Sequence, residues 1–245
     1  MQQTPSTTEP ENQSGGVAPA GAHRRVVIAG ASGLVGRCLL RGLLNDASVG
    51  EVHALGRRRL DLQHPKLRFY RSDFRTVPPL PPVDEVFLAL GTMIKQTGSR
   101  EGFRAVDFEA TLAVAQAAMA AGARRIGVVS AMNADVGSSL FYCRVKGDME
   151  AALSHLQPDA LVIVRPSYLL GNRAELNQPV RYGEKIGLGL SLLLRPVLPL
   201  NYRPVEASQV ADVLLTMVPT SHSKTIILSG EIYRFGRAPD CSRPG

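Results

Sequence analysis

Three glycines at intervals of three residues, directly after a short apolar segment, constrain the fold of this chain most strongly. Residues 26–29 are mainly β-branched, and Gly30, Gly33 and Gly36 follow them before a helical pattern begins. Glycine permits a tight turn and a close approach of backbone N–H groups to a phosphate, and the following helix N-terminus adds its positive dipole. A strand, a glycine turn and a helix in this order predict a dinucleotide-binding loop.

The rest of the chain alternates strand patterns with helix patterns. Further strands are predicted at 51–55, 67–70, 83–90, 125–129, 161–164 and 225–228, and helices at 102–121, 139–156 and 205–218. We therefore expect an α/β fold, a Rossmann-type doubly wound and mostly parallel sheet with helices on both faces and a small C-terminal substrate lobe. The links joining strands two, three and four carry no helical pattern, so we expect irregular crossovers there.

A single folded domain is expected from the length of 245 residues. Residues 1–22 lack the basic start and apolar core of a signal peptide, and we predict a disordered tail. Residues 23–245 would form one NAD(P)-binding domain, in which 166–204 contribute the substrate-side lobe. No apolar run reaches the roughly 18 residues of a membrane span. The longest candidate, 186–194, is expected to be a buried helix or a pocket wall.

The net charge of +7 suits anionic ligands or acidic surfaces. Because the basic residues are dispersed and no nucleic-acid-binding motif accompanies them, we do not expect nucleic acid as a partner. The three cysteines and five histidines share no metal-type spacing, so no metal site is expected. An odd number of scattered cysteines is typical of a reducing compartment, and we predict a cytoplasmic location.

The second predicted strand ends in Gly56 followed by three arginines at 57–59. Enzymes that prefer NAD usually place an acidic residue at this position, where it binds the ribose hydroxyls. Here guanidinium groups stand where the 2′-phosphate of NADP would lie, which favours NADP over NAD. The alternative interpretation is a solvated loop rich in arginine.

Tyr142 and Lys146 lie four residues apart near the start of the predicted helix 139–156. Four residues are just over one helical turn, so both side chains point to the same face. A neighbouring ammonium, together with an oxidised nicotinamide, favours the phenolate and lowers the tyrosine pKa from its usual value of about 10. The pair is therefore a candidate acid–base beside a nicotinamide, and a surface pair is the alternative.

These motifs together resemble the short-chain dehydrogenase/reductase superfamily in its extended or atypical branch. The resemblance is nearest to the small group of NADPH-binding, Tat-interacting-protein-like oxidoreductases and their bacterial relatives. It covers about residues 25–174, with weaker similarity to residue 218. The motifs that carry it are at 30–36, 56–58, 90–92, 103–107, 128–130, 141–147 and 164–166.

The resemblance implies a Rossmann fold that binds NADP and assigns roles residue by residue. The implied cofactor contacts are Gly30, Ser32, Gly33, Leu34 and Val35 at the pyrophosphate, Arg57 and Arg58 at the adenosine phosphate, Asp73 or the residue after it at the adenine, Leu90, Gly91 and Thr92 along the cofactor, and Lys146 and Pro166 at the nicotinamide end. The implied catalytic residues are Tyr142 as general acid–base, Lys146 as its partner and Ser130 as the hydroxyl that stabilises an oxyanion.

Two positions depart from the pattern of the superfamily. Ala131 occupies the place where a catalytic serine or threonine is common, which leaves Ser130 as the hydroxyl on the strand end. Asp107 stands where many relatives carry asparagine, so we expect no proton relay through it. Arg173, Arg181 and Arg203 could receive an anionic substrate or could be solvated.

We therefore predict an NADP-dependent oxidoreductase that transfers a hydride between the nicotinamide and a small carbonyl, alcohol or quinone-like substrate. The alternative is an NADPH-binding, redox-sensing regulatory protein with little or no catalysis, acting through a protein partner. An intact Tyr142–Lys146 pair favours the enzyme, and a large apolar patch at 186–200 would favour the regulator. The sequence leaves a protein partner or a homodimer open.

Overall fold

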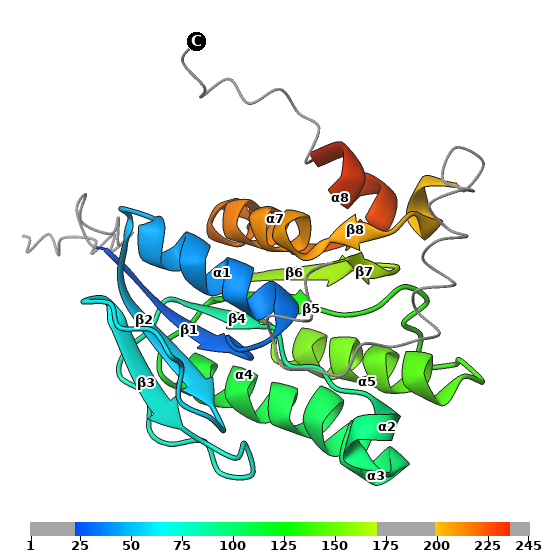
Figure 1. Ribbon diagram of the computed structural model, residues 1–245, viewed down its shortest axis with the longest axis horizontal. Coiled ribbons are helices and arrows are strands. Elements are labelled where there is room, and N and C mark those ends of the chain that lie inside the picture. The colour runs from blue at the N-terminus through cyan, green and yellow to red at the C-terminus, as the bar shows by residue number, and fades with distance from the viewer. Residues whose placement is uncertain (1–22, 171–198, 236–245) are drawn as a thin grey trace, which may run out of the picture.

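Seven strands form one parallel sheet in the order β3-β2-β1-β4-β5-β6-β9 in the computed structural model, which describes residues 23–170 and 199–235 (Figure 1). The strands are β1 (Arg24–Ala29), β2 (Val49–Gly56), β3 (Leu67–Arg71), β4 (Glu85–Leu88), β5 (Arg125–Val129), β6 (Ala160–Arg165) and β9 (Lys224–Leu228). Their pairings are all parallel. The short strands β7 (Leu169–Leu170) and β8 (Val205–Glu206) pair separately. The predicted α/β, Rossmann-type sheet is confirmed.

Helices cover both faces of this sheet. Figure 1 shows α1 (Leu34–Asn45) and α7 (Ala207–Thr220) over one face, and α4 (Thr111–Ala120) and α5 (Phe141–His155) over the other. Shorter elements are α2 (Ile94–Thr97), α3 (Arg100–Arg104), the π-helix η1 (Ala105–Ala110), the 3₁₀-helix η3 (Leu200–Tyr202) and α8 (Ser229–Phe235). The doubly wound arrangement follows from these two helical layers.

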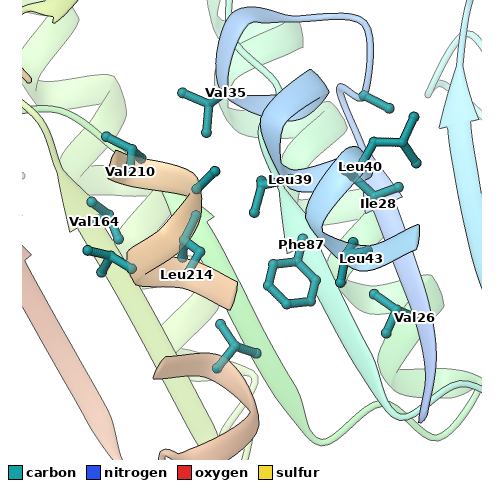
Figure 2. Packing of buried hydrophobic residues seen from close by; sticks show 14 of the residues in the cluster. Val26, Ile28, Val35, Leu39, Leu40, Leu43, Phe87, Val164, Val210 and Leu214 are labelled. Atoms are coloured by element: carbon teal, nitrogen blue, oxygen red, sulfur yellow. The ribbon is translucent and has the colours of Figure 1, made fainter. Parts of the chain in front are cut away.

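The central strand β1 is buried on both sides, so its side chains serve two cores. Val26 and Ile28 pack into the cluster with α1 and α7, whereas Val27 and Ala29 pack into the cluster with α4 and α5. On α1, a leucine stripe faces the sheet, and Figure 2 shows Leu39 and Leu43 on the side of the helix toward Phe87 of β4. Each such leucine, when fully buried, stabilises the fold by about 1.5–3 kcal/mol. This packing fixes the loop between β1 and α1.

The helix predicted at 102–121 is interrupted in the structure. It consists of α3, the π-helix η1 and α4, and the predicted strand 83–90 is shortened to Glu85–Leu88. A π-turn changes the direction in which its side chains point, and π-turns of this kind often occur at functional sites. In η1 the wider turn carries Asp107, which is 1% exposed. The spacing of hydrophobic residues in the sequence cannot reveal such a change from α-helical to π-helical hydrogen bonding.

The irregular links between β2, β3 and β4 are confirmed, because no helix joins these strands. The elements α2, α8, β7 and β8 were not predicted. The predicted helical segment at 186–194 lies outside the described residues, as do the tail at 1–22 and most of the lobe at 166–204. Within the described ranges, none of the helices combines the length and apolarity needed to cross a membrane.

Candidate active site

The candidate site lies beyond the carboxyl ends of the strands, where β1 has β2 on one side and β4 on the other. In open parallel sheets this reversal of strand order creates a crevice for ligands. Two hollows meet there. We call the one of about 720 Å³ the outer groove and the one of about 400 Å³ the inner pocket. The residues that line both hollows are Gly33, Ala89, Leu90, Gly91, Thr92 and Gln96.

The residues predicted to bind the cofactor or to take part in catalysis all line one or both of these hollows. The outer groove is lined by Gly30, Ser32, Gly33, Arg57, Arg58, Asp73, Leu90, Gly91 and Thr92. The inner pocket adds Leu34, Val35, Ser130, Tyr142, Lys146 and Pro166. The structure therefore brings residues from β1, β2, β3, β4, β5 and β6 to a single continuous depression.

The glycine turn leaves no room for side chains at two of its positions. Gly30 has φ of +88°, and a Cβ there would lie 2.4 Å from the carbonyl oxygen of Ala89. A Cβ on Gly36 would lie 2.0 Å from the carbonyl oxygen of Gly30. These close approaches bring α1 and the end of β4 against the turn, so the groove floor is bare backbone.

The N-terminus of α1 opens into both hollows. The N–H of Gly33 donates to the carbonyl of Gly30 at 2.9 Å and is used within the turn. No described side chain caps α1, and its first turn contains no acidic residue. The first N–H groups of this helix and its positive dipole end could therefore hold an anion such as a pyrophosphate.

Positive charge gathers at the far end of the outer groove. The exposed side chains of Arg57 and Arg58 line it, and they form no ion pair with any described carboxylate. Asp73 also lines the groove, and its carboxylate accepts from the backbone N–H of Arg75 at 3.0 Å. The guanidinium groups could hold a second phosphate at this end.

Tyr142 and Lys146 both face the inner pocket from the first turns of α5. The Tyr142 side chain is 42% exposed, and its ring lies 5.4 Å from the ring of Phe103, centroid to centroid. Lys146 is 4% exposed, and its Nζ lies 2.7 Å from Oδ1 of Asp107. The helix thus presents an accessible phenol above a buried, paired ammonium.

The charge of Lys146 is set by two opposing effects. Burial, the largest single influence, lowers its pKa because it disfavours the ammonium. Asp107, Tyr142 and Glu150 together outweigh burial, and the pKa of Lys146 is raised above its usual value. Lys146 is therefore a cation at neutral pH. Oδ2 of Asp107 also accepts from the backbone N–H of Thr92 at 2.9 Å.

The hydroxyl of Ser130 points to a carboxylate that sequence reasoning missed. Ser130 Oγ donates to Oε1 of Glu150 at 2.5 Å, and both side chains are buried. Arg165 donates to the same carboxylate through Nε at 2.9 Å and through Nη2 at 2.5 Å. Glu150 lies four residues after Lys146, so the helical spacing placed it on the same face and could have revealed it.

The inner pocket also contains residues that were not predicted, and the one described arginine among the three considered for substrate binding does not line it. Met93 and Gln96, near the start of α2, line the inner pocket and were not predicted. Arg203 lies outside both hollows, 5.9 Å from the ring centroid of Tyr233. Arg173 and Arg181 lie outside the described residues. Among the described residues, no group of three or more histidine, cysteine, aspartate or glutamate side chains could hold a metal ion.

Comparison with known protein families shows to which family this chain belongs. The HIM1 family profile matches residues 63–187, which is just over half of the sequence. The chain belongs to the HIM1 family.

Two curated relatives agree with this membership. Protein HTATIP2 of Rattus norvegicus is 33% identical over 160 residues, covering 62% of this chain and 66% of the rat protein, just under two thirds of its length. The mitochondrial protein FMP52 of Eremothecium gossypii is 35% identical over 197 residues, covering 78% of this chain and 87% of the fungal protein. The resemblance to the atypical branch near HTATIP2 is confirmed.

Solved structures share the fold of this HIM1-family chain. A short-chain dehydrogenase family protein from Francisella tularensis has a TM-score of 0.62 at 14% identity, covering 86% of this chain and all of that protein. MoeE5 in complex with UDP-glucose and NAD has a TM-score of 0.61 at 17% identity, covering 83% of this chain and 76% of MoeE5. At such low identities the likeness concerns the fold alone.

The predicted cytoplasmic location is wrong, because it is contradicted by the names of the curated relatives. Several fungal FMP52 proteins, at 27–35% identity, are named as mitochondrial. The prediction was based on unpaired cysteines. Free thiols indicate only that a compartment is reducing, and they cannot distinguish one reducing compartment from another.

Proposed function

We propose that this HIM1-family protein is an NADP-dependent oxidoreductase that reduces a small carbonyl or quinone-like substrate. The observation that carries the proposal is the continuity of the outer groove with the inner pocket. A ligand extended along it would have phosphate-binding features at two places, the N-terminus of α1 and the Arg57–Arg58 end, and a phenol at the other end. This sequence of features matches the order of groups in NADP.

The residues of the chain have separate parts in the proposed reaction. NADPH, when bound, supplies the hydride. Lys146 holds the nicotinamide ribose, and Pro166 and its neighbours hold the nicotinamide ring. Tyr142 donates its phenolic proton to the substrate oxygen as negative charge develops there. The described flanks of residues 166–204 are joined by the pairing of β7 with β8, next to the inner pocket that Pro166 and Leu169 line.

The cofactor preference can be tested by single arginine substitutions. Arg57→Ala and Arg58→Ala each remove a guanidinium that would pair with the 2′-phosphate. A hydrogen bond to a charged group contributes about 1.5–3 kcal/mol, so each variant should bind NADPH about 10- to 100-fold more weakly. Affinity for NADH, which lacks this phosphate, should remain nearly constant. Fluorescence titration with both nucleotides measures the two affinities.

Arg124→Ala is the matched control for this titration. Arg124 is exposed and precedes β5 at the amino ends of the strands, away from the groove. The change in net charge is the same, and both nucleotide affinities should stay at the wild-type level. Equal losses of NADPH and NADH affinity in the Arg57 and Arg58 variants would contradict NADP selectivity. No binding of either nucleotide to the wild type would contradict the proposed function itself.

The second candidate function is an NADPH-binding regulatory protein with little turnover. One observation favours it: Ser130 donates its hydroxyl proton to Glu150. A hydroxyl in this arrangement offers lone pairs to a substrate, and its proton is not available to an oxyanion. Tight NADPH binding with no NADPH oxidation across aldehydes, ketones and quinones would support the regulator.

A further inference from the structure

We propose that a second hollow beside the outer groove binds a free anionic amphiphile, a molecule with one acyl chain ending in a carboxylate, and that this ligand competes with NADPH. The hollow measures about 850 Å³ and lies between the segment 57–64 and the edge strand β3 (Figure 1). We call it the basic hollow. Its volume is within the range of about 300–1,000 Å³ that is usual for sites of small organic ligands. The competition rests on the proposed function, whereas binding of the amphiphile itself does not.

One wall of the basic hollow is apolar. Side chains alternate along β3, and Leu67 and Phe69 both pack at the margin of the core cluster that lies under α1. Leu60 packs against the same cluster, and Leu62, which is 43% exposed, extends the wall toward solvent. Three of these four side chains are aliphatic, which suits an alkyl chain better than a flat ring. Covering them with such a chain removes apolar surface from water, and this favours binding.

Four guanidinium groups surround this apolar wall. Arginines 57–59 follow β2, Arg71 ends β3, and all four side chains are exposed. None of them forms an ion pair with a carboxylate of the described residues. The described residues that line the basic hollow include no aspartate or glutamate. The charge therefore favours an anion, and a guanidinium fork matches the two oxygens of a carboxylate.

The basic hollow and the outer groove share part of their lining. Arg57, Arg58, Leu60 and Phe69 line both. In the proposed function, Arg57 and Arg58 hold the 2′-phosphate of NADPH. A carboxylate that these guanidinium groups bind in the basic hollow therefore takes the place of that phosphate. NADH has an uncharged hydroxyl at the same position, so the amphiphile should compete with NADPH and leave NADH affinity nearly unchanged.

The first test is calorimetric titration of the nucleotide-free wild type with hexanoate, octanoate and decanoate, each below its micellar concentration. Each pair of added CH₂ groups that reaches the apolar wall should tighten binding about 10-fold. Decyltrimethylammonium, which has the same chain length and the opposite charge, should not bind. An affinity that does not depend on chain length, or equal binding of the cationic amphiphile, would overturn the inference. Binding to phosphatidylglycerol vesicles without binding of decanoate would assign the arginines to a lipid surface and would also overturn it.

The second test uses variants that change the basic hollow alone. Leu62 and Arg71 line it and line neither the outer groove nor the inner pocket. Leu62→Ser should weaken decanoate binding about 3- to 10-fold through lost apolar contact. Arg71→Ala should weaken it about 2- to 5-fold, the effect of one exposed ion pair. Both variants should keep the wild-type affinity for NADPH. Unchanged decanoate affinity in both would place the ligand elsewhere and overturn the inference.

Arg68→Ala is the matched control on the same strand. Arg68 is exposed, does not line the basic hollow, and donates through Nη1 to the carbonyl of Pro65 at 2.9 Å. The change in net charge equals that of Arg71→Ala, and decanoate affinity should stay at the wild-type level. A loss equal to that of Arg71→Ala would show a general charge effect and overturn the inference.

The third test is competition between decanoate and the nucleotides. Increasing decanoate should raise the apparent Kd of NADPH in proportion to its occupancy of the basic hollow, while the apparent Kd of NADH stays nearly constant. No effect of saturating decanoate on NADPH, or an equal effect on both nucleotides, would overturn the competition. If the wild type binds decanoate as expected but binds no nucleotide, the proposed function fails and the amphiphile site stands. If it binds NADPH but no decanoate, the inference fails and the proposed function stands.

Discussion

Gly30→Ala is expected to lose about 2–5 kcal/mol of folding free energy, from roughly 1–2 kcal/mol for a left-handed alanine and about 1–3 kcal/mol for overpacking. The backbone at Gly30 has φ of +88°, which disfavours any side chain. The added Cβ would also lie 2.4 Å from the carbonyl oxygen and 2.5 Å from the carbonyl carbon of Ala89. These are backbone atoms beside the central strands, so the contact cannot be relieved by rotating a side chain.

Gly98→Ala separates the cost of a left-handed alanine from the cost of overpacking. Gly98 has φ of +77°, and a Cβ there would meet no atom within 4 Å. The Gly98→Ala variant should therefore lose only the folding free energy that a left-handed alanine costs, roughly 1–2 kcal/mol. Urea unfolding of both variants measures the difference. Equal losses at the two positions would contradict the close packing of the glycine turn against the end of β4.

Lys146→Met is expected to destabilise the protein by about 3–5 kcal/mol at neutral pH, because it leaves the Asp107 carboxylate buried without its cation. Asp107 is 1% exposed and Lys146 is 4% exposed, so water cannot replace the lost partner. Turnover should fall as well, since the same side chain is proposed to hold the nicotinamide ribose. Denaturant unfolding at several pH values measures the stability part separately.

The loss of folding stability in Lys146→Met should change with pH in a defined direction. The substitution removes Lys146, a group whose pKa in the folded protein is raised above its ordinary value of 10.5. The deficit relative to the wild type should therefore be fully present at neutral pH and should shrink as the pH rises above 10.5. In the wild type, the raised pKa of Lys146 means that its contribution persists through neutral pH and declines only as the pH rises above 10.5.

The double variant Lys146→Met with Asp107→Asn completes a thermodynamic cycle. Removing both charges leaves no unpaired ion, so most of the lost stability should return even though the ion pair is gone. Additive losses from the two substitutions would contradict a direct buried pair.

The sequence predicted the parts of this molecule that depend on neighbouring residues. The glycine turn is recognisable because strand, turn and helix follow one another within about a dozen residues at 26–36. Tyr142 and Lys146 are recognisable as a pair because helical spacing puts them on one face. The mostly parallel sheet follows from alternation of strands and helices, and the structure confirms it.

Contacts between distant segments were beyond sequence reasoning. Asp107 and Lys146 lie on different helices, and their contact depends on the π-turn that breaks the predicted helix 102–121. Ser130 lines the inner pocket, and its hydroxyl donates to Glu150, an unpredicted partner twenty residues away on α5. The spacing of hydrophobic residues within one helix or strand predicts which face of that element is buried. It does not predict which residue of another element will pair with a polar side chain on that face.

Transfer of deuterium from NADPH labelled at nicotinamide C4 is the measurement that tests the central claim most directly. Wild type and Tyr142→Phe are incubated with NADPH carrying deuterium at both C4 positions and with aldehydes and ketones, whose new C–D bond keeps the label, and the products are examined by mass spectrometry. With quinones, whose new O–D bonds exchange with water, NADPH oxidation is followed by absorbance instead. We predict deuterium in a wild-type product, a rate about 10²- to 10⁴-fold lower in Tyr142→Phe, and similar NADPH affinity for both proteins. Absence of deuterium from every alcohol product together with no NADPH oxidation by any quinone in the NADPH-saturated wild type, or equal transfer by Tyr142→Phe, would contradict the proposed hydride transfer with Tyr142 as its acid.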